Sequence, residues 1–436
     1  MPNAHVIGLG KSGIAAAKLL HQQGWRVQVS DRSPDAHNDE LTNLNIPVLA
    51  GYVPDWSEPT QLVVVSPGVP WDSDVLIKAR QLGIETIGEM ELAWRYLKAP
   101  WVGITGTNGK TTTTALVSAI WQAAGYCAPA CGNIGYASCE LATTGQALDW
   151  VIAEISSYQA EAAATISPRI GIWTTFTPDH LERHKTLENY YNIKASLLSR
   201  SQWQICNGDD PYLAAHWPDA CWTSIRGKDK LPGDPHQGCY LEAGWVYAQG
   251  EKIVRAEALA MGGEHNQQNL LMAVLAAKLA GIDAGAIAQG VAKFPGVPHR
   301  LERIANWRGK VFINDSKATN YDAALVGLRS VPGPVVLIAG GELKQGDATA
   351  WLELIKAKVA VVLLIGKAAP ELAAKLDQVN YSSYEIVETL DQAVMKAREC
   401  FGETVLLSPA CASFDQYQSF EQRGEHFRRL CQELLV

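Results

Sequence analysis

The sequence predicts an α/β protein of three domains, and three observations lead to this prediction. The chain has 436 residues, which corresponds to roughly three domains of ordinary size. Short apolar runs alternate with helical patterns, as in parallel sheets covered by helices. Two glycine-rich loops, residues 8–13 and 103–114, each follow a strand pattern and precede a helical one. Breaks before residue 100 and at the Pro-Gly-Val-Pro segment place the domains at residues 1–96, 97–297 and 298–436.

The composition excludes several classes of protein. A net charge of −8 argues against a general nucleic-acid-binding protein. The 9 cysteines are scattered without a C-x-x-C pair, which fits a reducing cytosol. No basic segment precedes the first apolar run, and the longest such run, residues 359–365, is too short to cross a bilayer. We expect a soluble cytoplasmic monomer that binds neither nucleic acid nor membrane.

The first domain opens with a strand at residues 5–7, a G-x-G-x-x-G loop and a helix to residue 20, and its next strand ends at Asp31. This order is the fingerprint of a Rossmann-like dinucleotide site and by itself predicts NAD. Two other interpretations stay open: the glycines serve only helix–sheet packing, or the fold holds another nucleotide with a diphosphate. A later strand, residues 62–65, runs into Ser66-Pro67-Gly68 at a strand end where open sheets bind ligands.

The central domain begins with Gly-Ile-Thr-Gly-Thr-Asn-Gly-Lys-Thr-Thr-Thr-Thr at residues 103–114. Backbone N–H groups of such a loop, with the positive end of the following helix, hold phosphate oxygens. Lys110 would reach the β- and γ-phosphates, and the Thr111 hydroxyl would bind Mg²⁺. The usual spacing requires glycine where Ile104 stands, so this is a variant phosphate loop of a P-loop-type ATPase domain. The alternative is a glycine turn with an incidental Lys-Thr pair.

Polar side chains follow the next strand patterns. Glu154 lies inside an apolar strand, residues 150–155, where a carboxylate is costly unless it is paired or bound to a metal. We interpret it as functional rather than as part of a buried ion pair. His180 follows a strand at residues 170–176. It either binds Mg²⁺ or phosphate, or it is a capping or surface histidine.

A helix at residues 187–199 carries Lys194 on what resembles a solvated face, so composition alone makes it an ordinary surface lysine. His184 lies four residues after His180, but Pro178 and the short charged run argue against a zinc-binding helix.

The third domain alternates strands with helical patterns, which predicts a doubly wound C-terminal domain. Its strands are expected at residues 310–314, 335–339, 359–365 and 404–407. Polar clusters again follow the strand ends, at residues 314–320, 340–344 and 408–415.

Together these motifs resemble the Mur ligases, the ATP-dependent enzymes that build the peptide of bacterial cell-wall precursors, along nearly the whole chain. The loop at residues 105–111 is that family's own form, which accounts for the missing first glycine. Glu154, His180 and Lys194 fall in the family's order and spacing. Within the family, residues 406–416 and 420–424 are similar to the D-glutamate-adding member.

The resemblance implies an ATP-dependent amide ligase that adds D-glutamate to UDP-N-acetylmuramoyl-L-alanine through an acyl phosphate, in peptidoglycan precursor synthesis. It implies catalytic roles for Lys110, Glu154, His180, Lys194 and Lys317. It also implies that Mg²⁺ is bound by Thr111, Glu154, His180 and Lys194, the last as a carbamate.

The resemblance further assigns binding residues to each substrate. ATP would contact Gly106, Thr107, Asn108, Gly109, Lys110, Thr111, Thr112, Asn269, Arg300 and Asp315. The first domain would hold the UDP end of the sugar nucleotide rather than NAD, through Lys11, Ser12, Asp31, Arg32, Ser66, Pro67 and Gly68, with Asn133 and Ser157 at the peptide end. D-Glutamate would contact Thr319, Lys344, Ser413, Phe414 and Phe420.

Three rival functions remain at this point. An NAD(P) oxidoreductase would use the first-domain fingerprint but leaves the phosphate loop, Glu154 and Lys194 unexplained. A folylpolyglutamate synthetase shares the phosphate loop but lacks this first domain and the Ser-Pro-Ala-Cys-Ala-Ser motif. A non-catalytic nucleotide-binding protein would not need polar loops that converge on one reaction.

Overall fold

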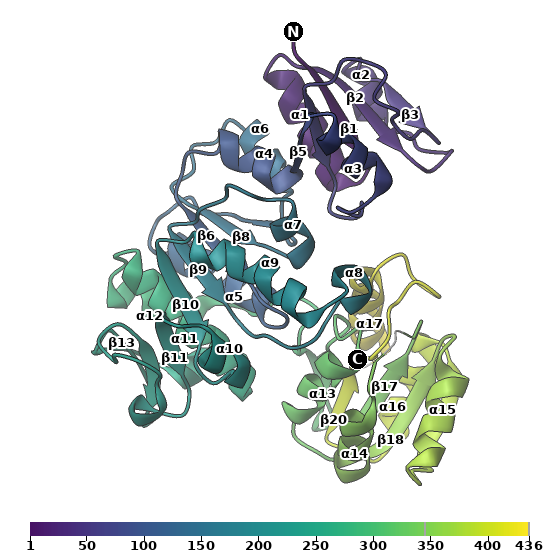
Figure 1. Ribbon diagram of the computed structural model, residues 1–436. Coiled ribbons are helices and arrows are strands. Elements are labelled where there is room, and N and C mark those ends of the chain that lie inside the picture. Colours follow the sequence, from purple (N-terminus) through teal and green to yellow (C-terminus); the bar gives the residue numbers. More distant parts are fainter. Residues whose placement is uncertain (344–345, 435–436) are drawn as a thin grey trace. The chain divides into compact units, whose positions relative to one another are not determined.

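The computed structural model describes residues 1–343 and 346–434 and confirms the α/β class. The chain divides into two compact units, Met1–Leu259 with Gln267–Phe294, and Ala260–Asn266 with Pro295–Val436 (Figure 1). The first unit contains two sheets and the second contains one. Among the described residues, no helix has the length and apolar character needed to cross a membrane. The domain bounds 1–96, 97–297 and 298–436 stay predictions.

The N-terminal sheet consists of parallel strands in the order β3-β2-β1-β4-β5. The order changes direction at β1, which pairs with β2 on one side and with β4 on the other. At such a switch point the loops after neighbouring strands diverge and open a crevice. The elements are β1 (Asn3–Ile7), α1 (Lys11–Gln22), β2 (Arg26–Asp31), α2 (Asp39–Asn43), β3 (Val48–Ala50), β4 (Leu62–Val65), α3 (Asp74–Gln81), β5 (Glu85–Gly88) and α4 (Glu89–Tyr96).

The central sheet has the order β14-β13-β12-β11-β10-β9-β6-β8-β7. Its strands are β6 (Trp101–Thr105), β7 (Ala130–Gly132), β8 (Val151–Glu154), β9 (Ile170–Trp173), β10 (Trp203–Asn207), β11 (Cys221–Ser224), β12 (Cys239–Glu242), β13 (Trp245–Ala248) and β14 (Glu251–Arg255). Its helices are α5 (Lys110–Ala123), α6 (Ser138–Thr143), α7 (Ser157–Glu161), α8 (Leu181–His184), α9 (Leu187–Ser199), α10 (Pro211–His216), α11 (Glu264–Leu279) and α12 (Ala284–Lys293).

The register of the central sheet explains why its polar residues meet. Strand β6 lies between β8 and β9, with Ile104 opposite Glu154 and Thr105 opposite Trp173. All three strands are parallel and buried along their length, so their carboxyl ends lie at one edge. The phosphate loop, Glu154 and the segment after Trp173 therefore share that edge.

One predicted strand is too long. The strand expected at residues 170–176 ends at Trp173. The hydroxyl groups of Thr174 and Thr175 donate hydrogen bonds to the carbonyl oxygen of Asn108, at 2.5 and 3.1 Å. These side-chain bonds tie the segment to the phosphate loop.

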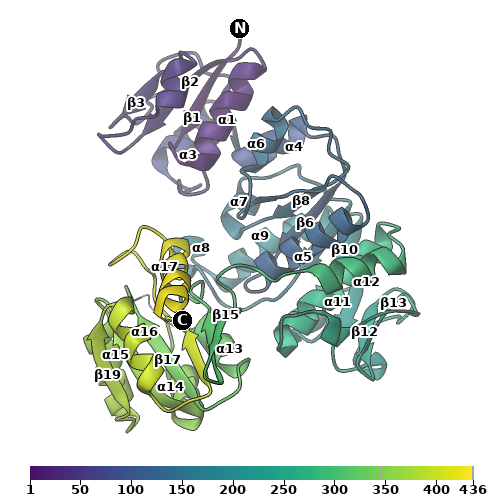
Figure 2. The same cartoon turned by 180° about the vertical axis from the view of Figure 1, so that it is seen from behind.

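The second unit has the sheet order β15-β16-β20-β17-β18-β19, with β15 antiparallel to β16 at one edge. Alternate residues of β17 pack into two separate cores, Val335 and Leu337 on one face and Val336 and Ile338 on the other. Helices therefore cover both faces, as Figure 2 also shows, and the doubly wound prediction is confirmed. The elements are β15 (Glu302–Trp307), β16 (Lys310–Asn314), α13 (Tyr321–Arg329), β17 (Val335–Gly340), α14 (Thr349–Lys358), β18 (Val359–Ile365), α15 (Ala369–Gln378), β19 (Tyr384–Glu388), α16 (Leu390–Glu399), β20 (Thr404–Leu407) and α17 (Phe420–Leu434).

The two sheets of the first unit share a hydrophobic core that extends from Ala4 and Leu19 to Trp101 and Val151. Within this region the carboxyl group of Glu89, at the start of α4, is buried and accepts a hydrogen bond from the backbone N–H of Cys139 at 2.6 Å. Burial raises the pKa of Glu89 to about 7 from an ordinary value of 4.5. As the pH rises, the Glu89 carboxyl group therefore loses its proton at a lower pH in the unfolded chain than in the folded protein.

We predict that Glu89→Gln stabilises the protein at alkaline pH. The folded state holds the proton more tightly, so the stability linked to Glu89 is complete below pH 4.5 and is lost as the pH rises toward 7. Glutamine keeps the carbonyl acceptor and does not ionise. The melting temperature at about pH 8 should rise by about 2 °C or more, and the difference should shrink toward about pH 5.

Circular dichroism melts over this pH range measure the effect. The control is Glu140→Gln, which changes an exposed glutamate in the neighbouring helix α6 and should shift the melting temperature little at any pH. An equal increase in melting temperature for Glu89→Gln at both ends of the pH range would show that ionisation of Glu89 does not limit stability.

Candidate active site

The phosphate loop joins β6 to α5, a helix of 14 residues. Gly109 precedes the helix with φ of 85°, a left-handed conformation that favours glycine. A Cβ atom at Gly109 would lie 2.6 Å from the side-chain oxygen of Asn269, so no larger residue fits without movement. The first turn of an α-helix leaves N–H groups without intrahelical acceptors, and the helix dipole makes this end positive. The loop thus has the local structure of an anion-binding site.

Two threonines of the β9 segment hold the phosphate loop in place. The backbone N–H of Asn108 donates to the Thr175 hydroxyl at 2.9 Å, and the N–H of Thr107 donates to the Thr175 carbonyl at 2.8 Å. The hydroxyl of Thr107 bonds to the Thr177 carbonyl at 3.0 Å and meets the Tyr190 hydroxyl at 3.2 Å. The loop is therefore supported by side chains that the sequence pattern did not single out.

Lys110, the first residue of α5, lies over this loop. Its Nζ donates to the carbonyl oxygens of Gly106 and Thr107, at 3.0 and 2.9 Å. Thr111 and Thr112 follow in the first turn and are buried. Thr113 donates its hydroxyl proton to the side-chain oxygen of Asn269 at 3.2 Å, which joins α5 to α11 beside the loop. The structure thus brings most of the predicted ATP-binding residues of the first unit together.

Glu154 ends β8 at the same sheet edge and is 1% exposed. Its Oε1 accepts a hydrogen bond from the Asn133 side chain at 2.8 Å. Its Oε2 is buried and has no hydrogen-bond partner among the described residues. A buried carboxylate oxygen without a donor fits a cation. The described residues contain no group of three or more His, Cys, Asp or Glu side chains, so a metal here would also need hydroxyl and phosphate oxygens. This donor set suits Mg²⁺.

Lys194 is buried, which corrects the expectation of a surface lysine. It is 1% exposed, and its Nζ donates to the Gly106 carbonyl at 2.8 Å. Helix α9 repeats every 3.6 residues, so Lys194 shares a face with the buried residues Tyr190 and Leu198, four positions to either side. Burial, followed by the nearby charge of Lys110, lowers the pKa of Lys194 well below its ordinary value.

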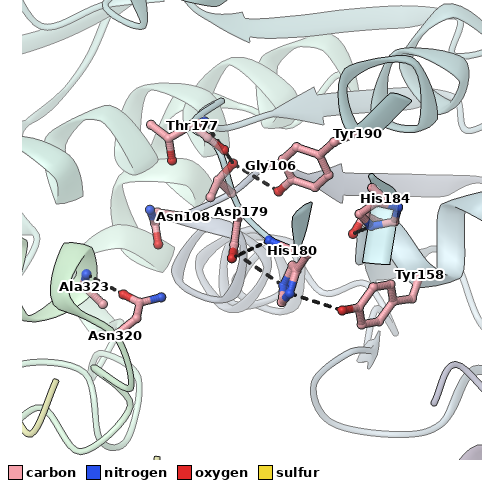
Figure 3. A network of polar contacts seen from close by, with 12 residues as sticks. Gly106, Asn108, Tyr158, Thr177, Asp179, His180, His184, Tyr190, Asn320 and Ala323 are labelled. Atoms are coloured by element: carbon pink, nitrogen blue, oxygen red, sulfur yellow. Dashed lines mark hydrogen bonds and ion pairs between the residues drawn. The ribbon is translucent and has the colours of Figure 1, made fainter. Parts of the chain in front are cut away.

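His180 is exposed and directly precedes α8 (Figure 3). Its Nδ1 lies 3.2 Å from the Tyr158 hydroxyl, and its Nε2 lies 3.4 Å from a carboxylate oxygen of Asp179. Asp179 also accepts the backbone N–H of His180 at 2.8 Å. The imidazole is therefore oriented from two sides. The charges of Lys110, Asp179 and Glu154 also act on Lys194, so three of the predicted catalytic residues are electrostatically coupled, and His180 adjoins them through Asp179.

The sequence interpretation gave no role to two residues of the segment after His180, since it considered His184 only as a zinc ligand and did not name Arg183. His184 is buried, and its Nε2 lies 2.9 Å from the hydroxyl of Ser157, a predicted substrate contact. Arg183 binds the Glu161 carboxylate at 2.8 Å and forms an ion pair with Asp72 of the N-terminal region. These contacts hold α7 and α8 together. No local sequence signal distinguishes them from ordinary charged helix residues.

In the second unit, Asp315, Lys317 and Thr319 lie after the end of β16, and Ser413 and Phe414 lie after the end of β20. Lys317 has its Nζ 4.3 Å from the centre of the Phe420 ring. Asp315 is buried, accepts hydrogen bonds from Ser408 at 2.9 Å and from the Leu301 N–H at 3.3 Å, and burial raises its pKa to about 7. Arg300 directly precedes Leu301, and its positive charge acts against burial by favouring a lower pKa for Asp315.

The predicted amino-acid contacts differ in exposure. Ser413 is buried, Phe414 is 69% exposed, and Thr319 is half-buried. Lys344 lies outside the described residues. Sequence reasoning also missed Arg423, which is buried in α17 and donates to the Ser316 and Cys411 carbonyls at 2.9 and 3.1 Å. Arg423 fixes the strand-end loops to one another.

The N-terminal sheet has a cavity of about 510 Å³ at its switch point. The lining includes the seven predicted first-domain contacts, namely Lys11, Ser12, Asp31, Arg32, Ser66, Pro67 and Gly68. The Ser66 hydroxyl donates to the Gly8 carbonyl at 3.1 Å, which joins the loops after β1 and β4. Asn133 and Ser157 do not line this cavity and lie instead beside Glu154 and His184.

Asp31 acts as an anchor within this cavity. Its carboxylate accepts the backbone N–H groups of Leu9 at 2.8 Å and of Ser33 at 2.9 Å. These two hydrogen bonds, the one from Ser33 first, lower the pKa of Asp31. The side chain thus stays ionised and fixes the loops that follow β1 and β2.

Comparisons with known proteins agree with this geometry. The family model described as Mur ligase MurD-like, N-terminal domain, matches residues 2–88, and the Mur ligase middle domain matches residues 104–277. The chain is 60% identical to the UDP-N-acetylmuramoylalanine--D-glutamate ligase of Trichormus variabilis over 455 residues, covering 100% of both chains. It is likewise 60% identical to the ligase of the same name from Gloeothece citriformis over 449 residues, covering 100% of both.

Solved structures show the same fold at low identity. A pseudomurein peptide ligase type C from Methanothermus fervidus superposes with a TM-score of 0.63 at 19% identity, and both chains are covered to 100%. The UDP-N-acetylmuramate-alanine ligase MurC from Thermotoga maritima gives the same TM-score, 0.63, also at 19% identity and 100% coverage of both chains.

Proposed function

The chain belongs to the Mur ligase family, and we propose that it joins D-glutamate to UDP-N-acetylmuramoyl-L-alanine at the site around Lys110, Glu154 and Lys194. It is an ATP-dependent ligase of peptidoglycan precursor synthesis. One observation supports the residue assignment above all. The phosphate loop with Lys110, the buried Glu154 carboxylate with one oxygen unpaired among the described residues, and the buried Lys194 lie together at one edge of the central sheet.

The reaction needs ATP because a carboxylate is a poor acyl donor. The alanine carboxylate of the nucleotide substrate attacks the γ-phosphate, which forms an acyl phosphate and releases ADP. The amine of D-glutamate then attacks the acyl carbon and loses a proton, and the tetrahedral intermediate expels phosphate to leave an amide. The first step brings two anions together, so the site must supply positive charge.

The residues of the first unit divide this work. The loop 106–112 binds the phosphates through its N–H groups, and Lys110 neutralises charge on the γ-phosphate. Glu154, Thr111 and His180 are proposed to hold Mg²⁺, which when bound neutralises phosphate oxygens. Asn133 and Ser157 orient the peptide end of the nucleotide, and their contacts with Glu154 and His184 support that role.

We assign Lys194 as a carbamate, the form in which it would add a negatively charged oxygen ligand for Mg²⁺. The neutral amine attacks carbon dioxide, an N–C bond forms, and one proton leaves. Burial beside the Gly106 carbonyl supports this assignment, because a charged ammonium group is costly in that position.

The second unit is proposed to bind D-glutamate through Thr319, Lys344, Ser413, Phe414 and Phe420. Lys317 is proposed to assist phosphoryl transfer, and Asn269, Arg300 and Asp315 are proposed to hold the adenine and ribose of ATP. The hydrogen bonds that Ser408 and Leu301 donate to the Asp315 carboxyl group hold it in a fixed orientation, which supports this role.

The testing experiment measures phosphate release from ATP with UDP-N-acetylmuramoyl-L-alanine and one amino acid at a time. We predict rapid release with D-glutamate and little with L-glutamate, L-lysine or diaminopimelate. Product mass must increase by one glutamyl residue. Phosphate release with another amino acid instead would contradict the substrate assignment. In a fluorescence titration, saturable binding of NADH would favour an oxidoreductase.

A further inference from the structure

The lining of the N-terminal cavity combines two kinds of chemistry. The amino terminus of α1, a helix of 12 residues that starts at Lys11, and the loop 66–68 both contribute to it. Helix N–H groups and a lysine favour a diphosphate there. Tyr52, Val53 and Pro54 also line the cavity, and they follow β3, which pairs with β2 on the side away from β1. These three side chains carry no charge that attracts phosphate, so this part of the lining suits an uncharged ring.

The backbone places Tyr52 beside Asp31, one of the predicted UDP contacts. The N–H of Tyr52 donates to the Asp31 carbonyl at 3.2 Å, and the N–H of Gly51 donates to the Ser33 carbonyl at 2.9 Å. The segment after β3 therefore continues the pairing with β2 across Asp31 and Arg32. Tyr52 is fixed at the rim of the cavity by main-chain bonds.

A buried histidine supports the Tyr52 ring from behind. The rings of His5 and Tyr52 have centroids 6.5 Å apart and planes inclined by 27°. His5 is 1% exposed and is held by Ser30 at 2.8 Å and by Gln28 at 3.0 Å. His5 does not line the cavity, whereas Tyr52 does and is 39% exposed. A tyrosine exposed on a rigid support is prepared for contact with a flat ligand.

We propose that the Tyr52 ring stacks on the pyrimidine base of the uridine nucleotide and is a specificity-determining residue of the substrate pocket. This inference rests on the proposed function, because it takes the uridine diphosphate end of the substrate as the occupant of the cavity. Stacking uses the π-face of the base, while hydrogen-bonding groups near Arg32 remain available for its polar edge.

The test compares UDP with inorganic pyrophosphate, which lacks the base, by isothermal titration calorimetry on the full-length chain. Tyr52→Ala should weaken UDP binding by roughly 10- to 100-fold and leave pyrophosphate binding unchanged. Tyr52→Phe keeps the ring and should bind UDP like the parent. In steady-state assays, Tyr52→Ala should raise the KM for the nucleotide substrate by a similar factor, with kcat unchanged.

Tyr126→Ala is the matched control, since Tyr126 is 38% exposed and does not line the cavity. If Tyr52→Ala unfolds, Tyr52→Leu keeps the side-chain bulk against His5 and gives the same comparison. If Tyr52→Ala weakens the binding of UDP and pyrophosphate equally, or does not weaken the binding of UDP, the stacking role is wrong. Failure of the parent chain to bind UDP at all would instead overturn the proposed function.

Discussion

Lys110→Ala should reduce ATP-dependent ligation by about 10³-fold, close to background. The ammonium group of Lys110 already lies within the phosphate loop, 3.0 Å from the Gly106 carbonyl and 2.9 Å from the Thr107 carbonyl. From that position it would oppose the repulsion between the triphosphate and the attacking carboxylate. Alanine removes this charge where the anions meet, and the resulting loss should appear in kcat as well as in kcat/KM.

Two further variants make the Lys110 experiment specific. Lys110→Arg keeps a positive charge but replaces a compact ammonium with a larger planar group, so activity should also fall strongly. Lys293→Ala removes an exposed lysine at the end of α12 and should leave turnover unchanged. The melting temperature of each variant separates lost chemistry from lost folding. Near-normal turnover of a folded Lys110→Ala protein would refute the phosphate-loop assignment.

Lys194→Ala should be inactive, and a short carboxylate such as acetate should restore part of the activity. The alanine variant leaves space at a buried position beside Gly106, and an added carboxylate supplies the anionic oxygen that the carbamate would have supplied. Loss of a buried group that touches the phosphate loop should lower kcat by about 10²-fold or more. Rescue should depend on the concentration of the carboxylate and should saturate.

A measurement that does not depend on activity tests the same assignment. The parent chain, incubated with isotope-labelled bicarbonate, should give the NMR signal of a carbamate carbon, and Lys194→Ala should not. Lys194→Arg provides the decisive contrast because a guanidinium group cannot form this carbamate. A fully active Lys194→Arg protein would show that the modification is unnecessary.

The prediction of Lys194 illustrates the limits of pattern reading. Composition alone made it an ordinary surface lysine, and only the resemblance to a family gave it a role. Its burial arises because α9 turns the face of Tyr190, Lys194 and Leu198 toward the protein interior. A single lysine among polar neighbours carries no local signal of that orientation. For Glu154 the pattern was sufficient, since a carboxylate within an apolar strand is itself unusual.

Tyr52, Arg183 and His184 were not identified from the sequence for a related reason. Each contacts partners distant in the chain: Tyr52 contacts His5, Arg183 contacts Asp72 and Glu161, and His184 contacts Ser157. Such pairings depend on which loops the sheets bring together. The order of strands in each sheet, which the sequence pattern did not predict, decides this.

The sequence by itself determined the α/β class, most strand and helix positions, the phosphate loop and the family. These features depend on local periodicity and on short motifs, which a chain displays before it folds. The tertiary structure decided that β6, β8 and β9 lie side by side and that α9 turns Lys194 toward the phosphate loop. It also decided that Glu154 keeps one buried oxygen without a hydrogen-bond donor among the described residues. Burial and electrostatic coupling depend on which residues are neighbours in space, and the strand order together with the packing of the helices decides this.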